Sequence, residues 1–224
     1  MAKTLFITGT DTGIGKTTIS EALATILKEQ NLNVGYFKPI ETGCDPTPSD
    51  GKILSRITGQ LVDEIVLYKF KEPLAPYPAS KLENVEISIE KILNHYKSLK
   101  DKYDYLIVEG AGGVCVPILK EENEFYTYVD LIKDMGIPVC VVSRAGLGTI
   151  NHTVLTVHIL KERGIELKGI LMNGFSKHKN IAEKTNPEII QEMTDLPVLS
   201  MCNKSQYPIK ECIKNLKDKI NKLF

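Results

Sequence analysis

The sequence of 224 residues contains no tryptophan, has a low aromatic content of 7%, and carries no excess of charge of either sign. Its 28 lysine and arginine residues are balanced by 28 aspartate and glutamate residues. A balanced charge produces no long-range field that would attract nucleic acid or an acidic membrane surface. We therefore expect neither nucleic acid nor a membrane as a partner, and the expected partners are small molecules.

The five cysteines form no C-x-x-C pair, and their spacing to histidine does not resemble a metal site. This usage is typical of reduced thiols in the cytosol. Long apolar runs that could cross a bilayer are absent, and so is the charged and then apolar segment of a secretion signal. These features predict a soluble, cytoplasmic protein.

Apolar runs of strand character alternate along the chain with patterns of helical spacing. The runs predict strands at 4–8, 34–40, 106–108, 137–143, 167–173 and 196–200, and helices at 19–27, 50–59, 87–99, 128–135, 153–163, 187–194 and 209–224. Three prolines in Lys71–Ser80 predict an ordered but irregular wall segment. The alternation predicts an α/β fold with a mainly parallel β-sheet flanked by helices on both faces. No linker or repeat divides the chain, so we expect a single domain over residues 1–224.

The stretch Gly9–Thr18 reads Gly-Thr-Asp-Thr-Gly-Ile-Gly-Lys-Thr-Thr and lies between a predicted strand and a predicted helix. Glycines allow a tight turn whose N–H groups point inward, the helix contributes its positive end, and Lys16 adds a full charge. The departure from the usual pattern is small, since Thr10 stands where the first glycine is expected. The stretch predicts a phosphate-binding loop and a P-loop NTPase-like fold, with nucleotide contacts from Gly13, Ile14, Gly15, Lys16, Thr17 and Thr18.

Polar side chains follow two other predicted strands. Lys38 ends one of them and is followed by a loop that contains Thr42, and Glu109 ends another, immediately before three glycines. Ligands of parallel sheets bind at the carboxyl ends of the strands. Thr17, Asp50 and Glu109 offer the hard oxygen ligands that Mg²⁺ requires. Asp50 also has a local explanation, because Ser49 is expected to cap a helix whose first turn favours a negative charge.

Two further features lie in the second half of the chain. The turn Arg144–His152 places two glycines and a threonine before a helix, which predicts an anion pocket suited to a carboxylate; a plain turn between strand and helix is the alternative. Asn173 ends a predicted strand, and its amide can both donate to and accept from a base edge.

In their order and spacing these motifs resemble the dethiobiotin synthetase family. The resemblance rests on Gly9–Thr17, Lys38-Pro39 with Thr42-Gly43, Ser49-Asp50, Val108–Gly113 and Leu147–His152. It implies an ATP- and magnesium-dependent ligase of biotin biosynthesis that closes a ureido ring on 7,8-diaminopelargonic acid with CO₂. The route would pass through a carbamate and a carbamic–phosphoric anhydride, and the enzyme would act as a homodimer.

The resemblance also implies roles for individual residues. Lys16, Lys38 and Thr12 would be catalytic, and Thr17, Asp50 and Glu109 would hold magnesium. Asn173 would recognise adenine. The substrate would be bound by Thr12, Lys38, Thr42 and Gly112, and its distant carboxylate by Gly148, Thr149, Ile150 and Asn151 of the partner subunit. The chain departs from relatives at Gly13, where some carry glutamate, and after residue 195, where a Gly-x-Ile-Pro signature is missing, so the sequence does not predict base preference.

A different class of protein shares the phosphate loop. Regulatory ATPases of the MinD and ParA type, which position septa and plasmids, carry an additional lysine at the position of Asp11 or Thr12. Neither residue is basic here, which argues against a nucleotide-switched regulator. A related amidoligase or a phosphate-loop accessory domain is a third interpretation. Amidoligases of that kind usually carry a glutaminase domain or depend on a partner, and a chain of 224 residues has no room for such a domain.

Overall fold

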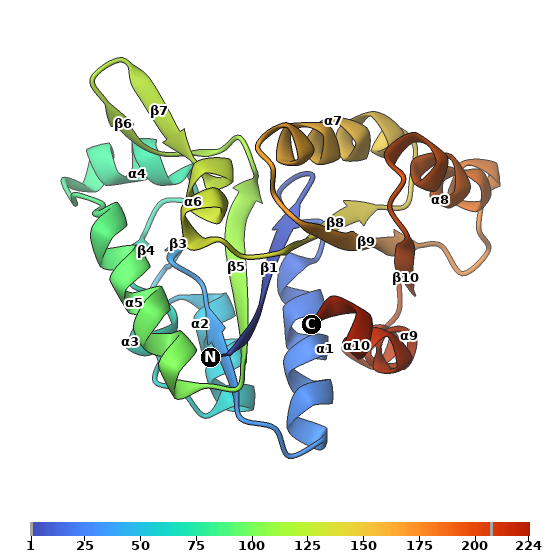
Figure 1. Ribbon diagram of the computed structural model, residues 1–224, viewed down its shortest axis with the longest axis horizontal. Coiled ribbons are helices and arrows are strands. Elements are labelled where there is room, and N and C mark those ends of the chain that lie inside the picture. Colours follow the sequence, from blue (N-terminus) through green and yellow to red (C-terminus); the bar gives the residue numbers. More distant parts are fainter. Residues whose placement is uncertain (1, 207) are drawn as a thin grey trace.

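The computed structural model describes residues 2–206 and 208–224. Six strands form the main sheet, in the order β10-β9-β8-β1-β5-β2 (Figure 1). Their bounds are Lys3–Gly9 (β1), Val34–Phe37 (β2), Tyr105–Gly113 (β5), Val139–Arg144 (β8), Leu167–Phe175 (β9) and Val198–Asn203 (β10). All neighbouring strands in this sheet are parallel. The predicted α/β fold with a mainly parallel sheet is confirmed.

The helices and two small sheets surround this main sheet. The helices are α1 (Lys16–Glu29), α2 (Ser49–Thr58), α3 (Val62–Ile65), α4 (Pro76–Glu83), α5 (Ile89–Lys102), α6 (Tyr128–Met135), α7 (Thr149–Glu162), α8 (Ile181–Thr194), α9 (Pro208–Leu216) and α10 (Ile220–Leu223). Strands β3 (Ile40–Thr42) and β4 (Tyr68–Phe70) pair in parallel, and β6 (Pro117–Glu121) and β7 (Glu124–Thr127) form an antiparallel hairpin. The hairpin projects from the molecule beyond α4 (Figure 1).

The sheet is covered by helices on both faces, because successive side chains of a strand point to opposite faces. In β1, Leu5 and Ile7 belong to a buried cluster that includes side chains of α1, α2 and α9, whereas Phe6 belongs to a second cluster that includes side chains of α5 to α8. All three side chains are fully buried. Burial on both faces explains why the central strands are uninterrupted apolar runs rather than alternating ones. Within the part of the chain that the structure describes, no helix combines the length and apolar character of a membrane span.

Several predicted element bounds were wrong. The segment predicted to be irregular contains helix α4, which begins at Pro76; prolines are tolerated there because the amides of a first turn need no intrahelical acceptor. Helix α7 begins at Thr149, four residues before the predicted start, directly after Gly148 with its φ of 88°. Helix α8 begins at Ile181 rather than Pro187, because Asn180 and Glu183 form a capping box. The β6–β7 hairpin was not predicted.

Candidate active site

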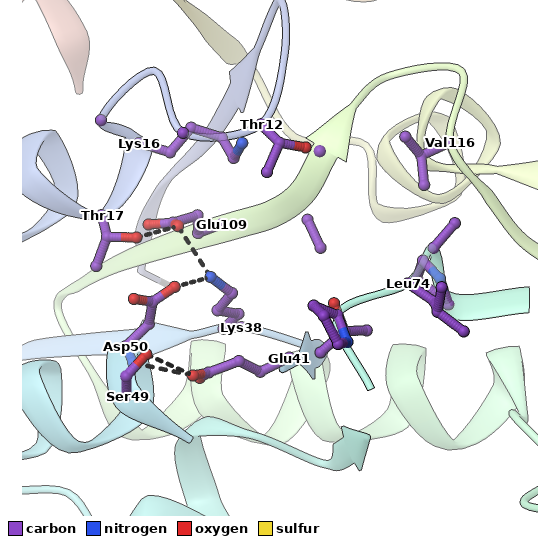
Figure 2. A pocket seen from close by; sticks show the side chains of 18 of the residues that line it. Thr12, Lys16, Thr17, Lys38, Glu41, Ser49, Asp50, Leu74, Glu109 and Val116 are labelled. Carbon is purple, nitrogen blue, oxygen red and sulfur yellow. Dashed lines mark hydrogen bonds and ion pairs between the residues drawn. The ribbon is translucent and has the colours of Figure 1, made fainter. Parts of the chain in front are cut away.

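The carboxyl ends of β1, β2 and β5 meet at a cavity of about 540 Å³ (Figure 2). Its walls come from the loop after β1, the segment after β2, the start of α2, the end of β5 and the segment before α4. Among the lining residues are Thr12, Gly13, Gly15, Lys16, Thr17, Thr18, Lys38, Glu41, Thr42, Asp50, Glu109 and Gly112. The structure therefore brings together most of the residues that the sequence singled out, at the sheet edge that the strand order predicted.

The loop between β1 and α1 has the backbone of a phosphate-binding loop. Gly13 and Gly15 have φ values of 70° and 95°, in the left-handed region that favours glycine. A Cβ at Gly15 would also lie 2.1 Å from Nδ2 of Asn173, so a larger residue does not fit there. The first turn of α1 contains no acidic side chain, so its positive end is not neutralised. The loop is suited to bind an anion.

Lys16 lies inside this loop and is 7% exposed. Its Nζ donates a hydrogen bond to the backbone carbonyl of Asp11 at 3.1 Å. Burial lowers the pKa of Lys16, and the nearby Glu109 carboxylate opposes this effect only in part. A bound phosphate would replace the solvent that the ammonium has lost.

Below the loop, Lys38 joins two carboxylates. Its ammonium forms ion pairs with Asp50 and with Oε1 of Glu109, the latter at 3.2 Å (Figure 2). Lys38 is 5% exposed and Glu109 is fully buried. Burial disfavours the ammonium, but the Glu109 and Asp50 carboxylates outweigh burial, so the pKa of Lys38 is raised. Lys38 is a permanent cation at physiological pH.

The carboxylate of Glu109 accepts hydrogen bonds on both oxygens. Oε1 accepts from Thr17 Oγ1 at 2.9 Å, while Oε2 accepts from Ser20 Oγ at 2.6 Å and from Tyr36 Oη at 3.0 Å. Sequence reasoning missed Ser20 and Tyr36. The sequence did contain a signal for Ser20, because Ser20 lies three residues after Thr17 and therefore on the same face of α1. The sequence contained no such signal for Tyr36, since this residue lies within an apolar strand.

Glu41 is a further residue that the sequence did not single out. Its carboxylate accepts the backbone N–H of Asp50 at 2.9 Å and that of Gly51 at 3.0 Å. The prediction that Ser49 caps this helix is wrong: Ser49 is the first helical residue, the N-cap is Pro48, and the Ser49 hydroxyl itself donates to Glu41. A side chain from a different element thus fulfils the capping role.

The donor set is chemically suited to magnesium. Thr17, Asp50 and Glu109 offer hydroxyl and carboxylate oxygens, and both carboxylates converge on one positive centre, the Lys38 ammonium. Among residues 2–206 and 208–224, no three histidine, cysteine or acidic side chains form a cage for a metal ion.

The opposite end of the cavity is apolar. Leu74 and Val116 lie across from the charged cluster (Figure 2), and Pro73, Ala75 and Pro76 complete this wall. The segment 71–80 therefore does line the cavity, although part of it is helical. A ligand that fills the cavity would have a charged or polar end and an aliphatic portion.

Asn173 lies on the other side of the phosphate loop, in a second cavity of about 600 Å³ that Ile14, Arg144 and Lys204 also line. Its Nδ2 donates to the backbone carbonyl of Ile14 at 3.0 Å, and its Oδ1 accepts the N–H of Gly174 at 2.9 Å. The side chain therefore holds the phosphate loop and retains one N–H for a ligand.

The predicted carboxylate pocket is not part of either cavity. Gly148, Thr149, Ile150 and Asn151 do not line the cavity at β1, β2 and β5 or the one at Asn173. Gly148 and Asn151 are exposed, and Thr149 is buried, with its hydroxyl 3.4 Å from that of Thr153. Within one chain these residues do not reach the phosphate loop cavity.

Solved structures share this fold at low sequence identity. The chain superimposes on a chain of a MinC:MinD cell division protein complex from Aquifex aeolicus with a TM-score of 0.62 and 13% identity, covering 99% of this chain and 93% of that one. A septum site-determining protein MinD from Pyrococcus horikoshii, complexed with Mg-ADP, gives a TM-score of 0.61 at 16% identity and covers 100% and 94% of the two chains. These likenesses show the fold alone. Asp11, one of the two positions at which the sequence lacks the lysine expected of such regulators, forms an ion pair with Arg144.

Sequence relatives are much more similar. A family model described as an AAA domain matches residues 3–205. The ATP-dependent dethiobiotin synthetase BioD of Aquifex aeolicus is 50% identical over 192 residues, covering 86% of this chain and 85% of the relative. The protein of the same description from Methanocaldococcus jannaschii is 45% identical over 204 residues, covering 88% and 92%. The chain belongs to the ATP-dependent dethiobiotin synthetase family.

Proposed function

We propose that the protein forms dethiobiotin from 7,8-diaminononanoate, CO₂ and ATP with the help of magnesium, and acts as a homodimer. The observation that carries this proposal is the composition of the cavity: a phosphate-binding loop faces a lysine held between two carboxylates, and an apolar wall closes the other end. A diamine with a long aliphatic chain matches both ends of this cavity.

The reaction needs positioning and charge neutralisation rather than a protein nucleophile. One amine of the substrate adds to CO₂ and loses a proton, which gives a carbamate. A carbamate oxygen attacks the γ-phosphorus of ATP, and ADP leaves. The second amine then attacks the carbonyl carbon of the mixed anhydride and loses a proton, the ureido ring closes, and phosphate leaves with the electron pair of the broken C–O bond.

The lysines of the cavity supply the positive charge for these steps. Lys16 would neutralise the β- and γ-phosphates, and Lys38, cationic throughout, would stabilise the carbamate and the phosphoryl group in transfer. The hydroxyls of Thr12 and Thr42 and the backbone at Gly112 would bind the diamine or its carbamate. All five residues line the same cavity.

Thr17, Asp50 and Glu109 would hold magnesium, which when bound shields the negative charge of the phosphates.

The remaining assignments concern the ends of the two substrates. Asn173 would contact adenine through its spare N–H. Gly148, Thr149, Ile150 and Asn151 would bind the distant carboxylate of a substrate held by the partner subunit, which agrees with their position outside the cavity of their own chain.

The direct test supplies purified protein with ATP, Mg²⁺, bicarbonate and the diamine, and measures the cyclic urea by mass spectrometry alongside released phosphate. We expect both products in equal amounts. ATP hydrolysis at the same rate with and without the diamine, and without cyclic urea, would contradict the ligase and would favour a nucleotide-switched regulator.

The shared site can be tested by mixing subunits. Asn151→Ala and Lys38→Ala proteins are each expected to be nearly inactive as homodimers. Mixed dimers would contain one pocket with neither change, so exchange of subunits should restore part of the activity. If verified mixed dimers remain inactive, each pocket is built within one chain.

A further inference from the structure

The two oxygens of the Glu109 carboxylate have different surroundings. Oε2 is held by two neutral hydroxyls, from Ser20 at 2.6 Å and from Tyr36 at 3.0 Å. Oε1 meets the Thr17 hydroxyl and the Lys38 ammonium, and both of these residues line the cavity. Ser20 and Tyr36 do not line it and are fully buried. One oxygen thus faces the protein interior and the other faces the cavity.

The fold places these two donors independently of each other. Ser20 lies one turn after Thr17 in α1, so the two hydroxyls share a face of that helix. Tyr36 lies in β2 opposite Ile107 of β5, and Glu109 follows Ile107 on the same face of β5 because side chains alternate along a strand. Helix α1 and strand β2 therefore converge on one carboxylate oxygen from two sides.

This arrangement restricts the motion of Glu109. A carboxylate whose inner oxygen accepts hydrogen bonds from two different elements rotates less freely than one held by a single donor. Tyr36 donates to this oxygen from a fully buried position, so water does not compete for its hydroxyl. The outer oxygen is consequently directed toward Thr17, Lys38 and the cavity that these residues line.

We propose that Ser20 and Tyr36 are positioning residues for metal binding: they fix the inner oxygen of Glu109 so that only its outer oxygen turns to the magnesium–nucleotide complex. The inference rests on the proposed function, since it assumes that the cavity takes a magnesium nucleotide. Partners that orient a metal ligand affect metal affinity even though they do not touch the metal.

Two conservative substitutions test this role. Tyr36→Phe and Ser20→Ala each remove one hydroxyl and leave the packing nearly unchanged. Tyr96→Phe is the matched control, because Tyr96 is also a buried tyrosine but does not line the cavity. For the first readout, Mg²⁺ is titrated into protein with ADP, and the concentration that gives half of the maximal rise in unfolding temperature is measured. The second readout is the Mg²⁺ concentration that gives half of the maximal turnover rate.

We expect Tyr36→Phe and Ser20→Ala to raise both Mg²⁺ concentrations by about tenfold, and Tyr96→Phe to leave both unchanged. In a Glu109→Gln background the further addition of Tyr36→Phe should have no effect on Mg²⁺ dependence, because the residue through which it acts has already been changed. Such non-additivity is the signature of a positioning role.

Two other outcomes would overturn the inference. If the variants unfold at lower temperature but keep the wild-type Mg²⁺ dependence, the two hydroxyls are structural. If the effect of Tyr36→Phe persists in full beside Glu109→Gln, Tyr36 does not act through Glu109. Failure of the proposed function is seen separately, because the wild-type protein would then form no cyclic urea, whereas the Mg²⁺ dependence of its stabilisation by ADP does not require the ligase reaction.

Discussion

Glu41 and Asp50 are joined by a hydrogen bond of 2.9 Å, in which the backbone N–H of Asp50 donates to the Glu41 carboxylate. Because Glu41 also accepts the N–H of Gly51, it fixes the first turn of α2 and with it the side chain of Asp50. That side chain in turn pairs with Lys38. A residue of β3 thus controls the position of a predicted metal ligand on another element.

Replacement of Glu41 should therefore affect stability and activity together. Glu41→Ala leaves two amides of α2 without their acceptor, so we expect the free energy of unfolding to fall by about 1–2 kcal/mol and dethiobiotin formation to decline as Asp50 loses its orientation. Glu41→Gln should cost less, since its amide oxygen still accepts one N–H. Urea denaturation and the ligase assay measure the two effects, with the exposed Glu86→Ala as control. A Glu41→Ala protein with normal stability would contradict the capping role.

The ion pairs of Lys38 with Asp50 and Glu109 predict variants in which stability is recovered but activity is not. Lys38→Met leaves the buried carboxylate of Glu109 without its positive partner, and a broken buried ion pair typically costs about 3–5 kcal/mol. Lys38→Met combined with Glu109→Gln removes both charges, so we expect much of the lost stability to return. Activity should not return, because the transferring phosphoryl group has still lost its cation. Recovery of turnover in the double variant would remove Lys38 from the mechanism.

The sequence predicted those parts of the site that depend on local pattern. The phosphate loop follows from its glycines, Lys16 and the adjoining helix, and Lys38 and Glu109 were identified because they end apolar strands. Glu41 and Tyr36 could not be predicted, since their roles depend on which distant element packs against them. The same reason explains the error at Ser49: a local capping signal was present, but a carboxylate from β3 was closer to the free amides. The prediction that Lys71–Ser80 is irregular was wrong for a different reason. Prolines are excluded from the middle of a helix but not from its first turn, and α4 begins at Pro76.

The ion pair between Arg144 and Asp11 connects the end of β8 to the phosphate loop. Asp11 also accepts the N–H of Thr12 at 2.7 Å and, through its carbonyl, the ammonium of Lys16. The pair is about half exposed, so we expect Arg144→Ala to change the free energy of unfolding by less than ~1 kcal/mol. Its effect should instead appear as a weaker affinity for ATP, by about fivefold.

Asp11→Asn is the matched variant for this pair, because it removes the charge but keeps an oxygen that can accept the Thr12 N–H. It should weaken ATP binding as much as Arg144→Ala, and the double variant should add little to either. Calorimetric titration at low and high salt measures the affinities, and the difference from wild type should shrink as salt screens the pair. Additive effects would mean that the two residues act separately.

The lowered pKa of Lys16 predicts how nucleotide binding depends on pH. Burial reduces the pKa of this ammonium below its ordinary value of 10.5, so Lys16 loses its proton at a lower pH than an exposed lysine does. The cationic form is the one that attracts phosphates. As pH rises through the lowered pKa, the affinity for ADP should therefore fall before pH 10.5 is reached, whereas a contact with an exposed lysine would weaken only near that value.

Lys16→Arg separates this effect from other titrations, because arginine stays charged over the whole range. Titration of ADP by calorimetry, without magnesium so that alkaline solutions remain clear, should show a declining affinity for the wild type and a flat profile for Lys16→Arg, even if the arginine binds more weakly overall. A parallel decline in both proteins would place the titrating group elsewhere. An affinity that stays constant in the wild type would mean that the Lys16 ammonium does not contact the phosphates, and the charge that neutralises them would then have to come from Lys38, the other lysine that lines this cavity.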